Sequence, residues 1–129
     1  MNIVFESNFM QQSIRKMISA TQKWNGKVIA DICVVPLGTS SPSVSEQVAH
    51  VERIFARFPL KTSIHANGTS IEGSWDDVSS AIKAMHEEVH ASGIERIHCN
   101  MRWGSRTDKT QTMEEKISKL QNLLARDKA

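Results

Sequence analysis

The sequence lacks several features that would assign it to a specialised class of protein. No apolar run approaches the ~20 residues that a helix needs to cross a bilayer, so neither a membrane-spanning protein nor a membrane partner is expected. Only two cysteines are present, Cys33 and Cys99, without a CxxC pair or a secretory signal. We therefore expect two reduced, buried thiols, with a disulfide between them as the alternative. No internal repeat or low-complexity segment is visible.

An excess of positive charge is absent from most of the chain. The formal net charge is +2, but residues 1–27 contribute +3, from four basic side chains and one acidic one, which leaves −1 for the rest. Because binding to a phosphate backbone normally requires a basic excess, nucleic acid is not expected as a partner. The length of 129 residues suits one domain, and 40% hydrophobic with 23% charged residues is typical of a globular protein.

Catalytic and cofactor motifs are also absent. The sequence has no Ser-His-Asp elbow, no paired acid and base motif, no GxGxxG and no P-loop spacing. It therefore predicts a protein that is not an enzyme and that uses no cofactor. The segment Gly104–Lys109 resembles an anion-holding loop, although a polar turn that leads into a helix explains it as well.

Residues 1–27 differ from the rest and are predicted to be an N-terminal extension. Their apolar side chains recur at near-helical spacing around Arg15 and Lys16. We expect an extra helix or a mobile arm, with a mitochondrial transit peptide as the alternative because the segment is amphipathic and poor in acidic residues. The expected location is cytoplasmic, with mitochondrial as the alternative. An Asn25–Gly26 turn separates the extension from a domain at residues 28–126.

The domain alternates between strand and helix patterns. The pattern predicts strands at 28–35, 61–67, 69–73 and 96–104, and helices from Pro42 to Phe58, from Ser74 to Gly93 and from Thr112 to Arg126. The expected helix caps are Ser41, or a capping box of Ser43 with Glu46, for the first helix, Ser74 with Asp77 for the second, and Glu115 for the third.

This order of elements is βαββαβ followed by a third helix. With right-handed crossovers and a central hairpin, this order predicts a ferredoxin-like α+β fold. Such a fold is an antiparallel sheet with both crossover helices on one face. The third helix is expected to turn inward an apolar stripe of Met113, Ile117, Leu120 and Leu124.

Side-chain alternation places polar groups on the sheet face that lacks helices. The residues predicted there are Asp31, Cys33, Val35, His65, Asn67, Ser70, Glu72, His98, Asn100 and Arg102. A bare face of this mixed character favours oligomerisation, with ligand pockets where subunits meet.

Glu72 is the leading binding candidate on this face. A carboxylate on a central strand accepts hydrogen bonds from a ring N–H or an amino group, and an ion pair with Arg102 is the alternative. His65 and His98 could bind a metal with Asp31 or Cys33, but no spacing motif links them. No metal site is therefore expected.

Three segments together are typical of one known family: Ala30–Thr39 (ADICVVPLGT), Gly68–Trp75 (GTSIEGSW) and Arg106–Lys109 (RTDK). They resemble, in this order, the opening strand, the hairpin motif and the closing loop of the small thiamine-binding-protein family. The resemblance covers about residues 28–126 and excludes residues 1–27. It implies a ferredoxin-like fold, assembled as dimers that pair into tetramers. It also implies binding of thiamine or its hydroxymethylpyrimidine moiety, without known catalysis.

The same resemblance implies a set of ligand-binding residues. Glu72 would hydrogen-bond the aminopyrimidine with help from Thr69 and Ser70, Thr39 and Ser40 would line the pocket, Asn100 and Arg106 would complete it at the subunit boundary, and Asp108 would fix the closing loop. Three other functions stay open: an oligomeric interaction module without a small-molecule ligand, an RNA-binding sheet, and a metal-dependent enzyme. The absence of aromatic residues from the central strands of the open face disfavours RNA.

Overall fold

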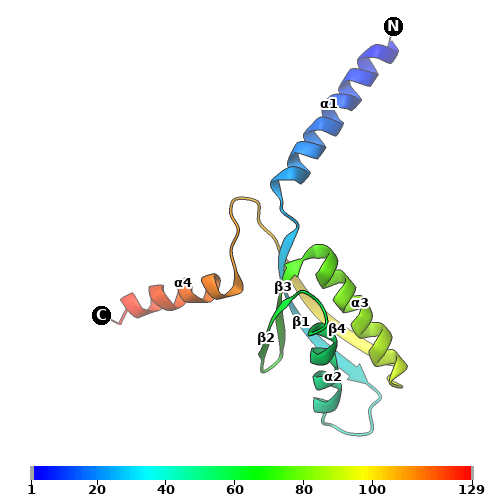
Figure 1. Cartoon of the computed structure of the whole chain (residues 1–129), viewed down its shortest axis with the longest axis vertical. Helices are drawn as coiled ribbons and strands as arrows, with labels where there is room; N and C mark the ends of the chain where they lie inside the picture. Colours follow the sequence, from blue (N-terminus) through cyan, green and yellow to red (C-terminus); the bar gives the residue numbers. More distant parts are fainter. Residues whose placement is uncertain (1, 129) are drawn as a thin grey trace.

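The computed structural model describes residues 2–128, and over this range four helices and four strands follow one another (Figure 1). Their bounds are α1 Asn2–Lys23, β1 Lys27–Leu37, α2 Ser45–Phe55, β2 Lys61–His65, β3 Gly68–Ser74, α3 Trp75–Ala91, β4 Arg96–Gly104 and α4 Met113–Arg126. All the strands and helices predicted for the domain are present, with ends shifted by a few residues. The extension contains a helix, α1, whereas its separation from the domain stays a prediction.

The strands form one antiparallel sheet in the order β2-β3-β1-β4. β1 lies in the middle, so that its residue Ile29 is opposite Glu72 of β3 and opposite Gly104 of β4. Figure 1 shows α2 and α3 on the same side of this sheet. The arrangement is the ferredoxin-like α+β fold that the order of elements predicts.

The core lies between the sheet and these two helices. Val28, Ala30 and Ile32 of β1 face the helices and are at most 3% exposed. They pack with Ile71 of β3, with Val51, Ile54 and Phe55 of α2, and with Val78, Ala81, Met85 and Val89 of α3. The intervening residues of β1 consequently point to the opposite, helix-free face.

The start of α2 differs from the prediction. Its N-cap residue is Val44, and no side chain caps the helix. The Ser41 hydroxyl accepts a hydrogen bond from the Ser43 amide instead, and the Ser43 hydroxyl pairs with Ser45. The predicted caps are therefore wrong, because these hydroxyl groups bond within the loop. The other predicted caps are confirmed: Ser74 with Asp77, and Glu115, which forms a capping box with Thr112.

α4 does not pack against the sheet of its own chain. Figure 1 shows α1 and α4 projecting from the domain in different directions. Met113 is 6% exposed, whereas Ile117, Leu120 and Leu124 are 54%, 61% and 61% exposed. The prediction that these last three residues point inward is thus wrong for the single chain. Within the described residues, no helix is long and apolar enough to span a bilayer.

The β2–β3 hairpin approaches β1 closely at Gly68. A Cβ at Gly68 would lie 2.5 Å from the carbonyl oxygen of Ile32, so a larger residue does not fit. Beyond this point β1 continues as Cys33–Leu37, which pairs only with β4 among the described strands. Asn67 lies in the hairpin turn and not on a strand face as predicted. Because β3 begins only at Gly68, a notch is left in the sheet beside Cys33–Leu37 of β1.

Candidate functional site

A slot of about 260 Å³ opens at this notch, between α2 and the β2–β3 hairpin. Its apolar lining comes from Val44, Val48, Val51 and Phe55 at and in α2, from Ile32, Val34 and Val35 of β1, and from Ile64 of β2. The α2 residues recur every three or four positions, which places them on one stripe of the helix facing the sheet. Ile64 is 67% exposed, so one apolar wall of the slot meets solvent.

Two polar side chains meet inside the slot. The Thr69 hydroxyl of β3 donates a hydrogen bond to Glu52 Oε1 of α2. Thr69 is 4% exposed because its pairing with Ile32 turns it toward the helices, and Glu52 is half-buried. Apolar walls with a few convergent polar groups are typical of small-ligand sites. The Glu52 carboxylate can accept an N–H from a ligand and attract a positive charge.

The helix-free face carries an ion cluster centred on Asp31. His65 Nε2 lies 2.7 Å from Asp31 Oδ1, and Arg102 Nη2 donates to Asp31 Oδ2 at 2.6 Å. The hydrogen bond from Arg102, followed by that from His65, lowers the pKa of Asp31. The cluster joins β1 to both edge strands. Arg102 is therefore paired with Asp31 and not with Glu72, the alternative that the sequence left open.

Glu72 is buried on the same face, and both of its carboxylate oxygens have partners. Lys27 Nζ lies 2.6 Å from Oε1, and the Met113 amide donates to Oε2 at 2.7 Å. Glu72 is 7% exposed. The residue therefore links the start of β1 to the first residue of α4. A ligand that hydrogen-bonded Glu72 would have to share or displace these contacts.

The closing loop between β4 and α4 is held by its own ion pair. Arg106 Nε donates to Asp108 Oδ1 at 2.7 Å, a second guanidinium nitrogen donates to Oδ2, and Nη1 donates to Gln111 Oε1 at 2.8 Å. The hydrogen bonds from Arg106 lower the pKa of Asp108 to about 2, and the same contact raises the pKa of Arg106. This geometry provides a structural basis for a role of Asp108 in fixing the loop.

The residues that the sequence grouped into one pocket lie in four places within the chain. Near the start of β1 lie Glu72, Arg106 and Asp108, and in the middle of the open face lie Ser70 and Asn100. The far end of β1 is followed by Thr39 and Ser40, whereas the slot on the helix side contains Thr69. Thr69 and Glu72 therefore point to opposite faces and cannot contact one small ligand together.

Glu72 and Asn100 share the open face, as alternation predicts, but they do not converge. Their partners on β1, Ile29 and Cys33, are separated by about 13 Å along the strand. A pocket that contained both residues would need a second chain to bridge them.

Two functional candidates were not found from the sequence. Glu52 lies one turn from Val48 and from Phe55 on the apolar stripe of α2. A charged residue inside an apolar helical stripe was the available signal. Lys27 precedes the predicted strand by one residue, and only the strand register reveals that it faces Glu72.

Metal ligands do not converge in the described part of the chain, where no group of three or more His, Cys, Asp or Glu could hold a metal ion. Cys33 and Cys99 are free and half-buried. Cys33 faces the open side, whereas Cys99 packs against the core. Burial, followed by the charge of Cys33, raises the pKa of Cys99 to about 11.

Comparisons with known proteins point to one family. A family model described as "Thiamine-binding protein" matches residues 30–121. A UPF0045 protein of Synechocystis sp. is 50% identical over 97 residues, which cover 75% of this chain and 79% of the relative. A UPF0045 protein of Eremothecium gossypii is 48% identical over 97 residues, which cover 75% of this chain and 92% of the relative. The family match begins after α1.

Solved structures confirm the fold. The crystal structure of a hypothetical protein from Methanocaldococcus jannaschii is 32% identical with a TM-score of 0.68, and the match covers 74% of this chain and 96% of that one. A Thermotoga maritima protein, whose description proposes a role in thiamine biosynthesis or salvage, is 20% identical with a TM-score of 0.62. That match covers 73% of this chain and 98% of the other, and it supports the fold alone.

Proposed function

Given that the chain belongs to the thiamine-binding protein family, we propose that it binds thiamine or its hydroxymethylpyrimidine moiety as a non-enzymatic homo-oligomer. The relatives named above carry no enzyme name. We place the ligand in the slot between α2 and the hairpin. Of the eight ligand-binding residues selected from the sequence, Thr69 alone lines this slot, and Glu72 lies outside it with the others. The observation that carries the proposal is the carboxylate of Glu52 inside an apolar slot of about 260 Å³.

The slot suits the chemistry of thiamine, which joins a flat aminopyrimidine to a positively charged thiazolium ring. The valine and phenylalanine walls would contact the ring faces. The Glu52 carboxylate would accept an N–H from the exocyclic amine and attract the thiazolium charge, while Thr69 orients that carboxylate. Cys33–Val35 pairs only with β4 among the described strands, so its other backbone edge offers further donors and acceptors.

The surroundings of Glu72 suit thiamine less well. Lys27 and Met113 already occupy both of its oxygens. The adjacent cavity beside the closing loop is lined by Lys27, Arg106, Lys109 and Lys116, which would repel a thiazolium cation.

Calorimetric titration of the full chain tests the proposal. We expect thiamine to bind with a dissociation constant between about 1 μM and 1 mM. An analogue with a keto oxygen in place of the exocyclic amine should bind about tenfold more weakly, because it cannot donate to Glu52. The absence of heat at millimolar thiamine and hydroxymethylpyrimidine would reject the proposal and favour the interaction module without a ligand.

The oligomeric part of the proposal rests on α4. Its Ile117, Leu120 and Leu124 form one exposed stripe, and a 14-residue helix is marginal in water without packing. We expect a second copy of the chain to cover this stripe. Sedimentation should therefore give a multiple of the 14.5 kDa chain mass. Leu120→Glu should shift the protein toward monomer.

The matched control for this prediction is Asn122→Glu, which adds the same charge on the opposite side of α4. This variant should keep the mass of the parent protein. A monomeric parent, or an equal loss of assembly in both variants, would contradict the role of the apolar stripe.

A further inference from the structure

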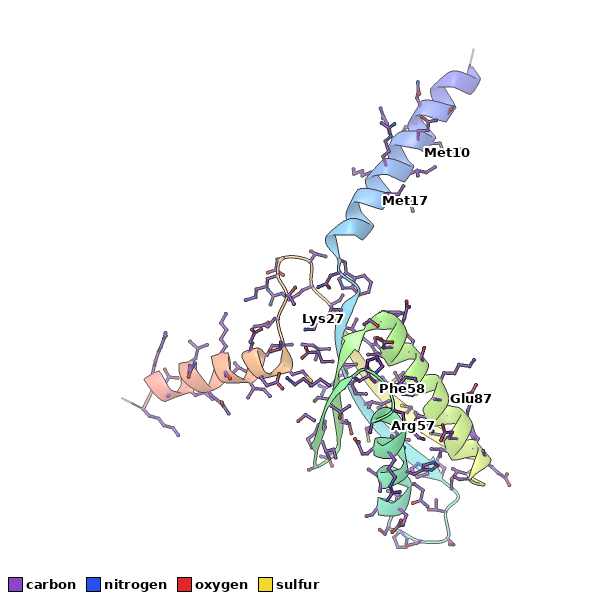
Figure 2. The ribbon with its side chains drawn as sticks, in the orientation of Figure 1. Met10, Met17, Lys27, Arg57, Phe58 and Glu87 are labelled. Atoms are coloured by element: carbon purple, nitrogen blue, oxygen red, sulfur yellow. The ribbon has the colours of Figure 1, made fainter. Side chains whose placement is uncertain are left out.

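A second cavity, of about 110 Å³, lies at the other end of the sheet from the slot. It is bordered by the start of β1, by the residues that follow β4 and by the first turns of α4. Figure 2 places Lys27 at this junction, beside the loop that leads to α4. Four basic side chains line the cavity: Lys27, Arg106, Lys109 and Lys116.

The charges around this cavity are not balanced within the chain. Lys27 is paired with Glu72, and Arg106 with Asp108. Among the described residues, Lys109 and Lys116 form no ion pair. The lining therefore carries two positive charges in excess of its acidic partners. Like charges gathered around a small cavity raise its local potential and attract an anion.

We propose that this cavity is a binding site for a phosphate group, either as inorganic phosphate or at the end of a small phosphate ester. Two ammonium groups and a guanidinium approach the cavity from the closing loop and from α4, which matches the several acceptor oxygens of a tetrahedral dianion. The neutral donors Asn25 and Thr110 lie at the same cavity. The small volume admits a phosphate group but not a nucleoside, and the net charge of −1 over residues 28–129 disfavours a polyanion.

A phosphate bound here would connect parts of the chain that are otherwise joined by few contacts. Lys109 belongs to the closing loop, whereas Lys116 belongs to α4. An anion held by both would add a further connection beside the hydrogen bond from the Met113 amide to Glu72 and the ion pair of Glu114 with Lys61. Phosphate binding should therefore slow amide exchange in the first turns of α4.

The test is titration of inorganic phosphate into the full chain at constant ionic strength, followed by calorimetry and by amide exchange in α4. The double variant Lys109→Gln/Lys116→Gln should bind phosphate at least tenfold more weakly, because each substitution removes a charged hydrogen-bond donor. Lys119→Gln is the matched control, since Lys119 does not line the cavity. It should leave phosphate binding unchanged.

Two results would overturn the site. One is equal phosphate affinity in the double variant and the parent, and the other is a response to phosphate no larger than that to chloride. A glycerol phosphate arm, which carries no thiazolium ring, distinguishes the two sources: tighter binding than inorganic phosphate identifies an ester. The inference does not rest on thiamine binding. If thiamine binds and phosphate does not, only the phosphate site fails, and the reverse result rejects only the proposed function.

Discussion

Replacing Glu52 by glutamine should weaken thiamine binding by about 1.5–3 kcal/mol, roughly ten- to hundredfold in the dissociation constant. Glutamine keeps the size of the side chain and a carbonyl oxygen for the Thr69 hydroxyl, so the slot should keep its shape. The change removes the negative charge that would face the thiazolium ring and the charged acceptor of the ligand amine. Calorimetric titration of the variant with thiamine measures the loss.

Glu46→Gln provides the matched control, because Glu46 is an exposed carboxylate in the first turn of the same helix and does not line the slot. Its affinity for thiamine should equal that of the parent. A comparison with Glu72→Gln then locates the site. If only Glu72→Gln reduced affinity, the ligand would bind on the open face and the assignment to the slot would be wrong.

Replacing Glu72 by glutamine should destabilise the chain by about 1–3 kcal/mol and release the start of α4. Glu72 is 7% exposed, so the substitution leaves the partly buried Lys27 ammonium without its charged partner. The amide can also accept from the Met113 N–H only if its oxygen points that way. Urea unfolding measures the loss of stability, and amide exchange at Met113 reports the release of α4.

Glu114→Gln is the control for this prediction. Glu114 pairs with Lys61 at 2.6 Å on the surface, where both side chains are more than half exposed. Exposed pairs contribute little to stability, so this variant should unfold like the parent. Equal behaviour of the two variants would show that Glu72 does not anchor α4.

The fold could be predicted from the sequence because apolar residues recur at a regular spacing along each strand and helix. Every second residue is buried around Ala30 and Ile32, which indicates a strand, whereas Val51 and Phe55 are four positions apart, which indicates a helix. The same spacing shows which face of each element packs in the core. The capping box before Met113 was predictable for the same reason, since it depends on local spacing.

The placement of α4 was not accessible in this way. The stripe of Ile117, Leu120 and Leu124 indicates that a face of the helix will be covered, but it does not indicate by which surface. In the single chain the sheet does not cover it.

The candidate site was only partly predictable. Alternation correctly put Glu72 and Asn100 on one face, but distance along the sheet depends on the register between strands, which the sequence does not specify. Thr69 was selected together with Glu72, although the two residues are three positions apart on one strand and their side chains therefore point to opposite faces. The slot forms because the pairing between β1 and β3 does not extend beyond Ile32. The position at which two strands cease to pair cannot be predicted from amino-acid composition.

The contacts that α4 makes with the sheet lie at Met113 and Glu114, so the rest of the helix can rotate about this first turn as a pivot. Met113 is the one buried residue in the described part of α4, and the 14 residues of the helix extend about 21 Å from it. A rotation of about 10° at the pivot would therefore move the far end by roughly 4 Å. In the proposed oligomer, the spacing between neighbouring copies would then depend on the strength of the hydrogen bond between the Met113 amide and the Glu72 carboxylate.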